Sequence, residues 1–456
     1  MKTHTHISSR INQAPDDFTL PVDWHTDAIV DRRSRFYAAS QRAFVPYRTP
    51  LIFQRGQDQY LWDEEGNQYL DCLSQNLCVS IGYNNPAVTR AVQQQAEQIQ
   101  HCTTMFFHPV PAHLAEELVA KFPEGEDWVV HFTSSGAEAI DFALLLARSY
   151  TQRDDILSLS NAYHGATFGA QSVTGISNFR HPVPLLGGIQ FVPNPDQYRG
   201  VFGEGVAPYL DAIDRAVHYG TCGRIAGMFF EPIQGYGGIV PAPDGYLQGA
   251  FERVRAAGGL CIVDEVQSGF GRTGEGYWAF EHDNVIPDIV VLAKGIGNGY
   301  PLGAVVAKRE VAEVMADKFY FNTYGANPVS CSAGRAVLRV IDECGLVDNA
   351  KQVGSALLAV LTRMAEKYDL IGDVRGRGLM MAAELVKDHA TKEPAVEEMH
   401  ELFQLTRRHG LVASKSGAYK NVLRICPPLC IQMDDVPFFE SAIDASFADL
   451  YSGVRV

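Results

Sequence analysis

Two short apolar segments, each followed by a charged residue, most constrain the fold of this chain. Cys261–Val263 and Ile289–Leu292 are apolar and mostly β-branched, and they are too short to span a membrane. Such runs predict buried parallel strands. Asp264 follows the first run directly, and Lys294 follows the second after one residue. Because open α/β sheets bind ligands at the carboxyl ends of their strands, we expect a carboxylate and an amine to meet there.

The sequence around Lys294 favours a chemical role for this residue. It lies in Ala-Lys-Gly-Ile-Gly-Asn-Gly, a glycine-rich loop with apolar neighbours. A lysine that loses its solvation has a lowered pKa and becomes a nucleophile. A lysine that forms a Schiff base and an acid that holds a pyridinium nitrogen are what a protein contributes to pyridoxal phosphate chemistry. The plainer alternative is a structural aspartate and a surface lysine.

The segment Asp264–Lys294 resembles the cofactor-binding signature of the class III (ω-) aminotransferases, a family of pyridoxal phosphate (PLP) enzymes of fold type I. It is most similar to the branch that contains alanine–glyoxylate aminotransferases and phospho-lyases, and the resemblance runs from about Pro50 to the C-terminus. It implies an α/β fold, in which helices flank a mostly parallel central sheet. A smaller α+β domain is then expected to form from both termini.

The resemblance also implies a domain division. Residues 1–72 are expected to form an N-terminal arm and a meander that belong to the small domain, with the arm over about the first 20 residues. Residues 73–335 are expected to form the large PLP-binding domain, and residues 336–456 the C-terminal small domain.

The pattern of elements agrees with this fold class. Strands and helices alternate from about residue 125 to residue 310, which favours a mixed, mostly parallel sheet with helices on both faces. Arg55–Asp58 lies between two apolar runs and predicts the turn of a hairpin. Asp63–Asn67 predicts a second turn.

The resemblance assigns a set of residues to the cofactor, with Lys294 and Asp264 as the catalytic pair. Small residues at a helix start let a phosphate reach free N–H groups, which the helix dipole also favours. Residues of this kind follow a predicted strand at Ser135, Gly136 and Ala137. The other expected contacts are the ring-stacking Tyr163, Glu231 near the cofactor, Gln267 at the ring hydroxyl, and Thr323, whose hydroxyl reaches the phosphate across a dimer interface. His164, beside Tyr163, fits either a core histidine or a site residue.

Four further residues are expected at the substrate. Gln75 and Asn76 occupy a loop that faces the substrate in the family, where aminotransferases commonly have glycines. The resemblance places Phe107 in a loop near the entrance of the substrate pocket. In some family members this loop lies at the pocket of the neighbouring subunit. Arg424 matches an arginine that can bind a substrate carboxylate with two parallel hydrogen bonds.

Three functions remain open on these residues. The first is an aminotransferase that moves an amino group from a primary (ω- or β-) amine or amino acid to a 2-oxo acid such as pyruvate or glyoxylate. The second is a lyase that eliminates ammonia or phosphate from an aminoethylphosphonate or phospho-amine. The polar pair Gln75 and Asn76 favours this function, because it resembles the asparagine-bearing loop of the lyases. Arg424 favours the aminotransferase, because an arginine can bind a substrate carboxylate. It is also compatible with the phosphate or phosphonate group of a lyase substrate. The third is a non-catalytic binding protein of the same fold.

Composition limits the partners. The net charge of the 456-residue chain is −15 and no basic run offsets it, which argues against nucleic-acid and anionic-membrane partners. Nine scattered cysteines without a Cys-x-x-Cys pair favour free thiols in a reducing cytoplasm and no metal site. No signal peptide is expected. A cytoplasmic homodimer or higher oligomer with shared active sites, acting on small amine and oxo-acid substrates, is the resulting expectation.

Overall fold

The structure is a computed structural model that describes residues 20–455 and divides into two compact units. The first unit comprises residues up to Gln54 together with Asp63–Asn67. The second comprises Arg55–Trp62 and the chain from Gln68 onwards. Apart from Leu20, the arm expected at the N-terminus lies outside the described residues, and the domain boundaries expected at residues 72 and 335 remain a prediction.

The first unit contains two helices and a turn. The helices are α2 (Thr26–Phe36) and α3 (Ala39–Arg42). The carboxylate of Asp63 accepts backbone hydrogen bonds from Glu65 at 3.1 Å and from Asn67 at 2.8 Å. These bonds close the turn that was predicted at Asp63–Asn67, because an aspartate side chain can replace a backbone acceptor two residues on.

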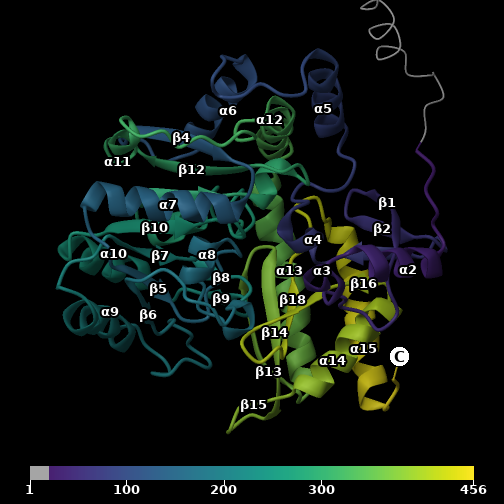
Figure 1. Ribbon diagram of the computed structural model, residues 1–456. Helices are drawn as coiled ribbons and strands as arrows, with labels where there is room; N and C mark the ends of the chain where they lie inside the picture. Colours follow the sequence, from purple (N-terminus) through teal and green to yellow (C-terminus); the bar gives the residue numbers. More distant parts are fainter. Residues whose placement is uncertain (1–19, 456) are drawn as a thin grey trace, which may run out of the picture. The chain divides into compact units, whose positions relative to one another are not determined.

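A seven-stranded sheet dominates the second unit (Figure 1). The strand β12 runs antiparallel to both of its neighbours, and the other pairs are parallel, so the predicted mixed and mostly parallel sheet is confirmed. In spatial order the strands are β4 (Trp128–Thr133), β12 (Gly303–Lys308), β11 (Ile289–Leu292), β10 (Leu260–Asp264), β7 (Gly227–Phe230), β5 (Ile156–Leu159) and β6 (Ile189–Val192).

Side chains of the central strands alternate between two hydrophobic cores, one on each face of the sheet. On β10, Cys261 and Val263 belong to one core, whereas Leu260 and Ile262 belong to the other. All four are at most 8% exposed, which explains why this strand is apolar throughout. Figure 1 shows α7 lying across one face of the sheet, and its buried residues form much of the second core.

The helices around this sheet begin where polar side chains cap them. Asn85, Ser135 and Asn327 each accept a hydrogen bond from a backbone N–H in the first turn of the following helix, which satisfies donors that the helix itself leaves unpaired. The α-helices of this part of the chain are α5 (Pro86–Gln98), α6 (Pro109–Val119), α7 (Gly136–Thr151), α8 (Phe168–Val173), α9 (Ala207–Gly220), α10 (Tyr246–Ala256), α11 (Arg309–Ala312) and α12 (Pro328–Glu343). The short segment labelled α4 (Ser74–Leu77) has positive φ angles and is a left-handed turn. The 3-10 helices are η1 (Ser177–Phe179), η2 (Ala279–Asp283), η3 (Lys294–Gly297), η4 (Glu313–Met315) and η5 (Met433–Asp435).

The C-terminal part of the chain adds a second sheet and three helices. The sheet has the order β13 (Ile371–Arg377), β14 (Met380–Asp388), β18 (Val422–Ile425) and β17 (Ser414–Ser416), and β15 (Glu393–Pro394) pairs with β14. The helices are α13 (Leu346–Lys367), α14 (Val396–Arg408) and α15 (Val436–Tyr451). A two-stranded hairpin, β8 (Ile233–Gln234) with β9 (Val240–Pro241), forms a separate small sheet.

Segments from both ends of the sequence share a third sheet. Its order is β1 (Phe53–Gln57), β2 (Tyr60–Asp63), β3 (Gln68–Asp71) and β16 (Leu411–Val412). The predicted hairpin is confirmed, but its turn is shorter than the predicted Arg55–Asp58. The strand β1 continues to Gln57, and Asp58 makes the reversal with a φ of 51°. Within residues 20–455, no helix has the length and apolar character needed to cross a bilayer.

Candidate active site

Asp264 and Lys294 lie at the ends of two adjacent parallel strands. Asp264 ends β10, opposite Val291 of β11, and Lys294 begins η3 two residues after β11 ends. Asp264 is 5% exposed and Lys294 is half-buried. Burial lowers the pKa of the Lys294 amine, and the nearby Arg424 lowers it further, while Cys78 and Asp264 oppose the shift. A lysine in this environment is closer to the neutral, nucleophilic form than a solvated one.

Asp264 is held in place by two hydrogen bonds. Its Oδ1 accepts the backbone N–H of Val266 at 3.0 Å, and its Oδ2 lies 2.7 Å from Nδ1 of His164. Burial alone would lower the pKa of His164, but the hydrogen bond to Asp264 and the charges of Asp264 and Glu231 outweigh burial, so this pKa is raised. His164 therefore holds the Asp264 carboxylate in addition to packing in the core. Its contact is not visible in the sequence, where the two residues are 100 positions apart.

Glu231 joins two loops at the site. Its Oε1 accepts the backbone N–H of Tyr163 at 2.9 Å, and its Oε2 accepts that of Gly235 at 3.0 Å. Burial raises the pKa of Glu231 to about 7, and the charge of His164 opposes that shift. The ring of Tyr163 lies 4.6 Å from that of Phe179, measured between centroids. Glu231 thus fixes the backbone that carries Tyr163 and His164.

The start of α7 packs against both catalytic loops. A methyl group added at Gly136 would lie 3.3 Å from Cβ of Ala293 and from the methyl groups of Val266. Ala293 precedes Lys294, and Val266 follows Asp264 by two residues. Gly136 and Ala137 belong to the first helical turn, whose N–H groups have no partner within the helix. The predicted phosphate-binding segment therefore lies beside the loops that carry Asp264 and Lys294.

Arg424 is a buried cation among neutral acceptors. It lies on β18 and is 3% exposed. Its Nε donates to Oγ of Ser414 at 2.8 Å, its Nη1 to Oε1 of Gln267 at 3.4 Å, and its Nη2 to Oδ1 of Asn76 at 3.1 Å. Burial lowers the pKa of Arg424. Among residues 20–455, no carboxylate forms an ion pair with this guanidinium, which leaves it able to bind an anion.

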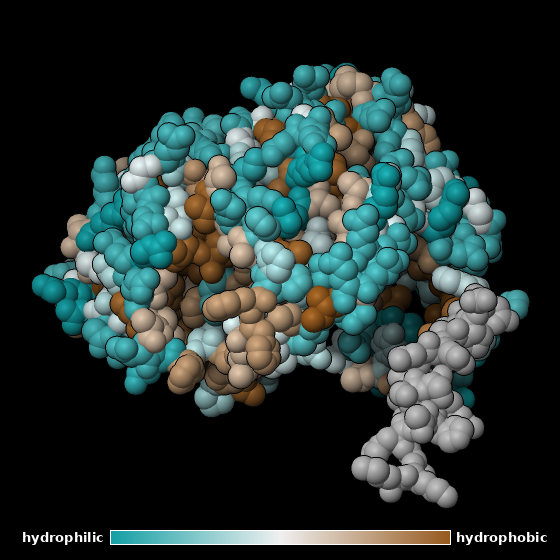
Figure 2. Space-filling view, turned by 90° about the horizontal axis from the view of Figure 1, so that it is seen from above, coloured by the Kyte–Doolittle hydropathy of each residue, from teal (hydrophilic) through white to brown (hydrophobic). Residues whose placement is uncertain are grey.

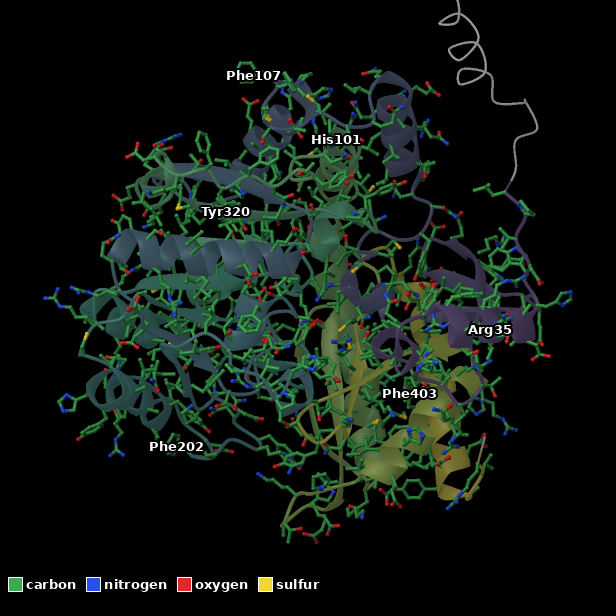
Figure 3. All side chains as sticks on the ribbon, viewed as in Figure 1. Arg35, His101, Phe107, Phe202, Tyr320 and Phe403 are labelled. Carbon is green, nitrogen blue, oxygen red and sulfur yellow. The ribbon has the colours of Figure 1, made fainter. Side chains whose placement is uncertain are left out.

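The structure brings most of the predicted residues together, but not all of them. Gln75 adjoins Asn76 and is exposed on the same short segment. Phe107 is fully exposed, with a relative accessibility of 103%, and Figure 3 shows its side chain projecting outwards from the top of the molecule. Thr323 is also exposed. Within residues 20–455, no hydrogen bond or ring contact links these last two residues to Asp264 or Lys294.

We expect Glu265, next to Asp264, to make the stability of the fold depend on pH. Burial raises its pKa to about 8, although Ser268 and the backbone N–H of Phe280 donate hydrogen bonds to it. The folded state thus binds a proton more tightly than the unfolded chain does. We expect this contribution to the free energy of unfolding to be complete below about pH 4.5 and to be lost, by on the order of a few kcal/mol, as the pH rises to 8.

Urea unfolding at pH 5.5, 7 and 8 measures this effect. The Glu265→Gln variant retains an acceptor for Phe280 and can donate to Ser268, so its unfolding free energy should fall less with pH than that of the wild type. Glu310→Gln, on an exposed residue of α11, should follow the wild type. Equal slopes for wild type and Glu265→Gln would contradict the prediction.

The fold and the site together define a class of protein. The family model for class III aminotransferases matches residues 44–445, and the chain belongs to this family. It is an enzyme that transfers amino groups to oxo acids. The predicted family, fold class and enzymatic activity are thereby confirmed, and a non-catalytic binding protein is not supported.

Particular relatives narrow the comparison. The chain is 44% identical over 436 residues to alanine–glyoxylate aminotransferase 2 homolog 2, mitochondrial, of Arabidopsis thaliana. The matched region covers 96% of this chain and 90% of the relative. It is similar to the structure of a thermostable (S)-enantioselective ω-transaminase from Thermomicrobium roseum, with a TM-score of 0.86, 32% identity, and coverage of 94% and 100%. It is also similar to a phospholyase from Arthrobacter in complex with phosphoethanolamine, with a TM-score of 0.84, 32% identity, and coverage of 92% and 99%.

Proposed function

We propose that this aminotransferase binds PLP and moves an amino group from a primary amine or amino acid to a small 2-oxo acid such as pyruvate or glyoxylate. The observation that carries the choice of acceptor is Arg424, a buried guanidinium near Lys294 that forms no ion pair with a carboxylate of residues 20–455. A planar guanidinium matches the geometry of a carboxylate. The similarity to an alanine–glyoxylate aminotransferase homolog supports the same choice.

The residues of the site fit PLP in charge and shape. The free N–H groups at the start of α7 suit a phosphate, and a side chain at Gly136 would crowd the catalytic loops. Asp264 suits a protonated ring nitrogen, and Lys294 suits covalent attachment of the aldehyde. The remaining proposed contacts are Ser135, Ala137, Tyr163, Glu231, Gln267 and, from a second subunit, Thr323. When bound, PLP supplies an electron sink for the carbon that loses a proton.

Four residues of the site each have a definable task in this reaction. The Lys294 amine, once free, can take the proton from the substrate Cα and carry it away from that carbon, since burial keeps its pKa low. Asp264 keeps its charge directed at the ring nitrogen because Val266 and His164 hold both of its oxygens. Arg424 orients the carboxylate of the substrate. Glu231 keeps the loop of Tyr163 and His164 fixed.

A homodimer completes this proposal. Met105, Phe106, Phe107, Phe319 and Phe321 are between 52% and 107% exposed. Figure 2 shows hydrophobic patches between hydrophilic residues on the face seen from above. Large exposed apolar patches mark interaction sites. A second copy of the chain that covers these loops would bring Thr323 and Phe107 to the site of its partner, as the family resemblance implies. A cytoplasmic location stays a prediction, since the name of the Arabidopsis relative includes mitochondrial.

Elimination is the second candidate function. The polar side chains of Gln75 and Asn76 and the similarity to a phospholyase favour it. A guanidinium also binds phosphate, so Arg424 suits either substrate class. If the substrate has a leaving group next to the carbon that loses its proton, loss of that group competes with the onward delivery of the proton by Lys294.

Dependence on an oxo acid separates the two functions. We expect the purified, PLP-loaded enzyme to consume alanine or a primary amine only when pyruvate or glyoxylate is present, and to form the aminated acceptor in equal amount. Mass spectrometry of the products and assays for ammonia and phosphate measure this. Release of ammonia or phosphate from phosphoethanolamine or an aminoethylphosphonate without any oxo acid would contradict the transaminase assignment and establish the lyase.

A further inference from the structure

The segment that carries Asn76 has an unusual backbone. Ser74, Gln75, Asn76 and Leu77 have φ values of 52°, 49°, 60° and 64°, so four consecutive residues without glycine form a left-handed turn. This conformation costs about 1–2 kcal/mol per residue for most side chains, and asparagine tolerates it best. Backbone strain of this kind persists only where the surrounding structure holds it, and it gathers at functional sites.

The two ends of the turn are fixed, whereas its middle is exposed. The carboxylate of Asp71 accepts the backbone N–H groups of Leu73 at 2.8 Å and Ser74 at 2.9 Å. The Ser74 hydroxyl donates to the carbonyl of Cys426 at 2.6 Å, and Leu77 is 2% exposed. Gln75 and Asn76, between these anchors, are exposed. The side chain of Asn76 can therefore change its partner while both anchors stay in place.

Asn76 occupies the part of Arg424 that a substrate anion needs. With Nε bound to Ser414, the guanidinium has only its Nη1 and Nη2 edge for a planar anion, and two amide oxygens cover that edge. The oxygen of Gln267 lies 3.4 Å away, and that of Asn76 lies 3.1 Å away. The amide of Asn76 is neutral and offers one oxygen, whereas a carboxylate adds a full negative charge and two parallel acceptors for the guanidinium, so it would replace Asn76. A substrate group without charge would not.

We propose that Asn76 is a displaceable cap on Arg424, which sets the preference between substrates with a carboxylate and substrates without one. This inference rests on the proposed function. A carboxylate displaces the Asn76 amide and takes its place on Nη2. When a neutral substituent enters instead, Asn76 stays and spares the guanidinium a buried, unpaired donor, which is costly. One site thus accepts both an oxo acid and an amine that lacks a carboxylate.

Two substitutions at position 76 test the cap in opposite directions. Asn76→Asp places a permanent carboxylate beside Arg424, and we expect it to raise the KM for pyruvate about tenfold or more. Asn76→Gly removes the cap and keeps the left-handed backbone, since glycine adopts positive φ freely. It should lower the KM for pyruvate by about threefold, a change of roughly half a decade. Asn284→Asp, at an exposed asparagine with φ 52° after η2, is the matched control and should leave KM unchanged.

The second substrate and a binding measurement complete the test. In Asn76→Asp, the KM for 1-phenylethylamine, which has no carboxylate, should stay within about twofold of wild type. Calorimetry with propionate, a carboxylate that cannot react, should show weaker binding to PLP-loaded Asn76→Asp and tighter binding to Asn76→Gly. If both substitutions shift the KM for pyruvate and the affinity for propionate in the same direction, the cap is overturned.

The two proposals fail in distinguishable ways. A wild-type enzyme that converts no amine in the presence of any oxo acid overturns the proposed function, while the propionate series still tests the cap. A wild-type enzyme that transfers amino groups to pyruvate but does not bind propionate overturns the cap alone. Because Asn76→Gly adds no charge, its propionate affinity decides the matter even if Asn76→Asp fails to fold.

Discussion

Replacing Lys294 with alanine is expected to abolish amino transfer, with kcat reduced by at least about a thousandfold. General acid–base catalysis by a positioned side chain contributes about 10²–10⁴-fold, and the loss of covalent attachment adds to this. Burial lowers the pKa of Lys294, which favours the neutral amine that proton transfer and covalent attachment both need. Its position just after β11 places this amine at the site. The fold should tolerate the change, because the variant removes a charge from a half-buried position.

Two measurements check this expectation. The first is kcat with a primary amine and pyruvate. The second is borohydride reduction followed by peptide mass spectrometry, which should find the cofactor on Lys294 in the wild type and unattached in the variant. Lys351→Ala, on an exposed position of α13, is the matched control and should behave as wild type. Turnover by Lys294→Ala within about tenfold of wild type would refute the role of Lys294.

Replacing Asp264 with asparagine is expected to have the second largest effect, a loss of about 10²–10³-fold in kcat with little change in KM. The amide has nearly the shape of the carboxylate but no charge, so the charge-assisted hydrogen bond to a ring nitrogen is lost. Electrostatic groups aimed at developing charge commonly contribute factors of this size. The neighbours Val266 and His164 remain in place to hold the side chain.

A second readout for this variant does not depend on activity. Because the hydrogen bond and charge of Asp264 raise the pKa of His164 against its burial, the substitution should lower that pKa, as measured by NMR titration of the imidazole. Asp244→Asn is the matched control, because the exposed Asp244 also faces a histidine, with its Oδ1 3.3 Å from Nε2 of His282. This substitution should leave kcat unchanged. An unchanged His164 titration in Asp264→Asn would show that the two residues are not coupled.

The sequence predicts those parts of the site that follow from local patterns. Asp264 and Lys294 each come just after a continuous apolar run, and such runs form buried parallel strands. Their position at the carboxyl ends of two strands could therefore be predicted. The start of α7 could be predicted for the same reason, since a strand and small residues precede an apolar helical face. These signals need only a few neighbouring residues.

The contacts that complete the site are not local and could not be predicted. His164 meets Asp264 across 100 positions, and Arg424 meets Asn76 across 348. The left-handed turn at Ser74–Leu77 has no glycine to signal it, because anchors elsewhere in the chain hold its strained backbone. Tertiary contacts overrode local preference there, as is common at functional sites.

The parallel pairing of β3 with β16 has a consequence for the order in which the enzyme assembles. The backbone N–H of Cys72 donates to the carbonyl of Val412, and the Ser74 hydroxyl donates to that of Cys426, so the turn that bears Asn76 leans on residues made more than 300 positions later. The seven-stranded sheet can form on the ribosome while translation continues, since domains fold as units during synthesis. The turn that bears Asn76 gains these partners only after Val412 and Cys426 have left the ribosome. The part of the molecule that bears Asn76 is therefore expected to reach its final form later in synthesis than the central sheet.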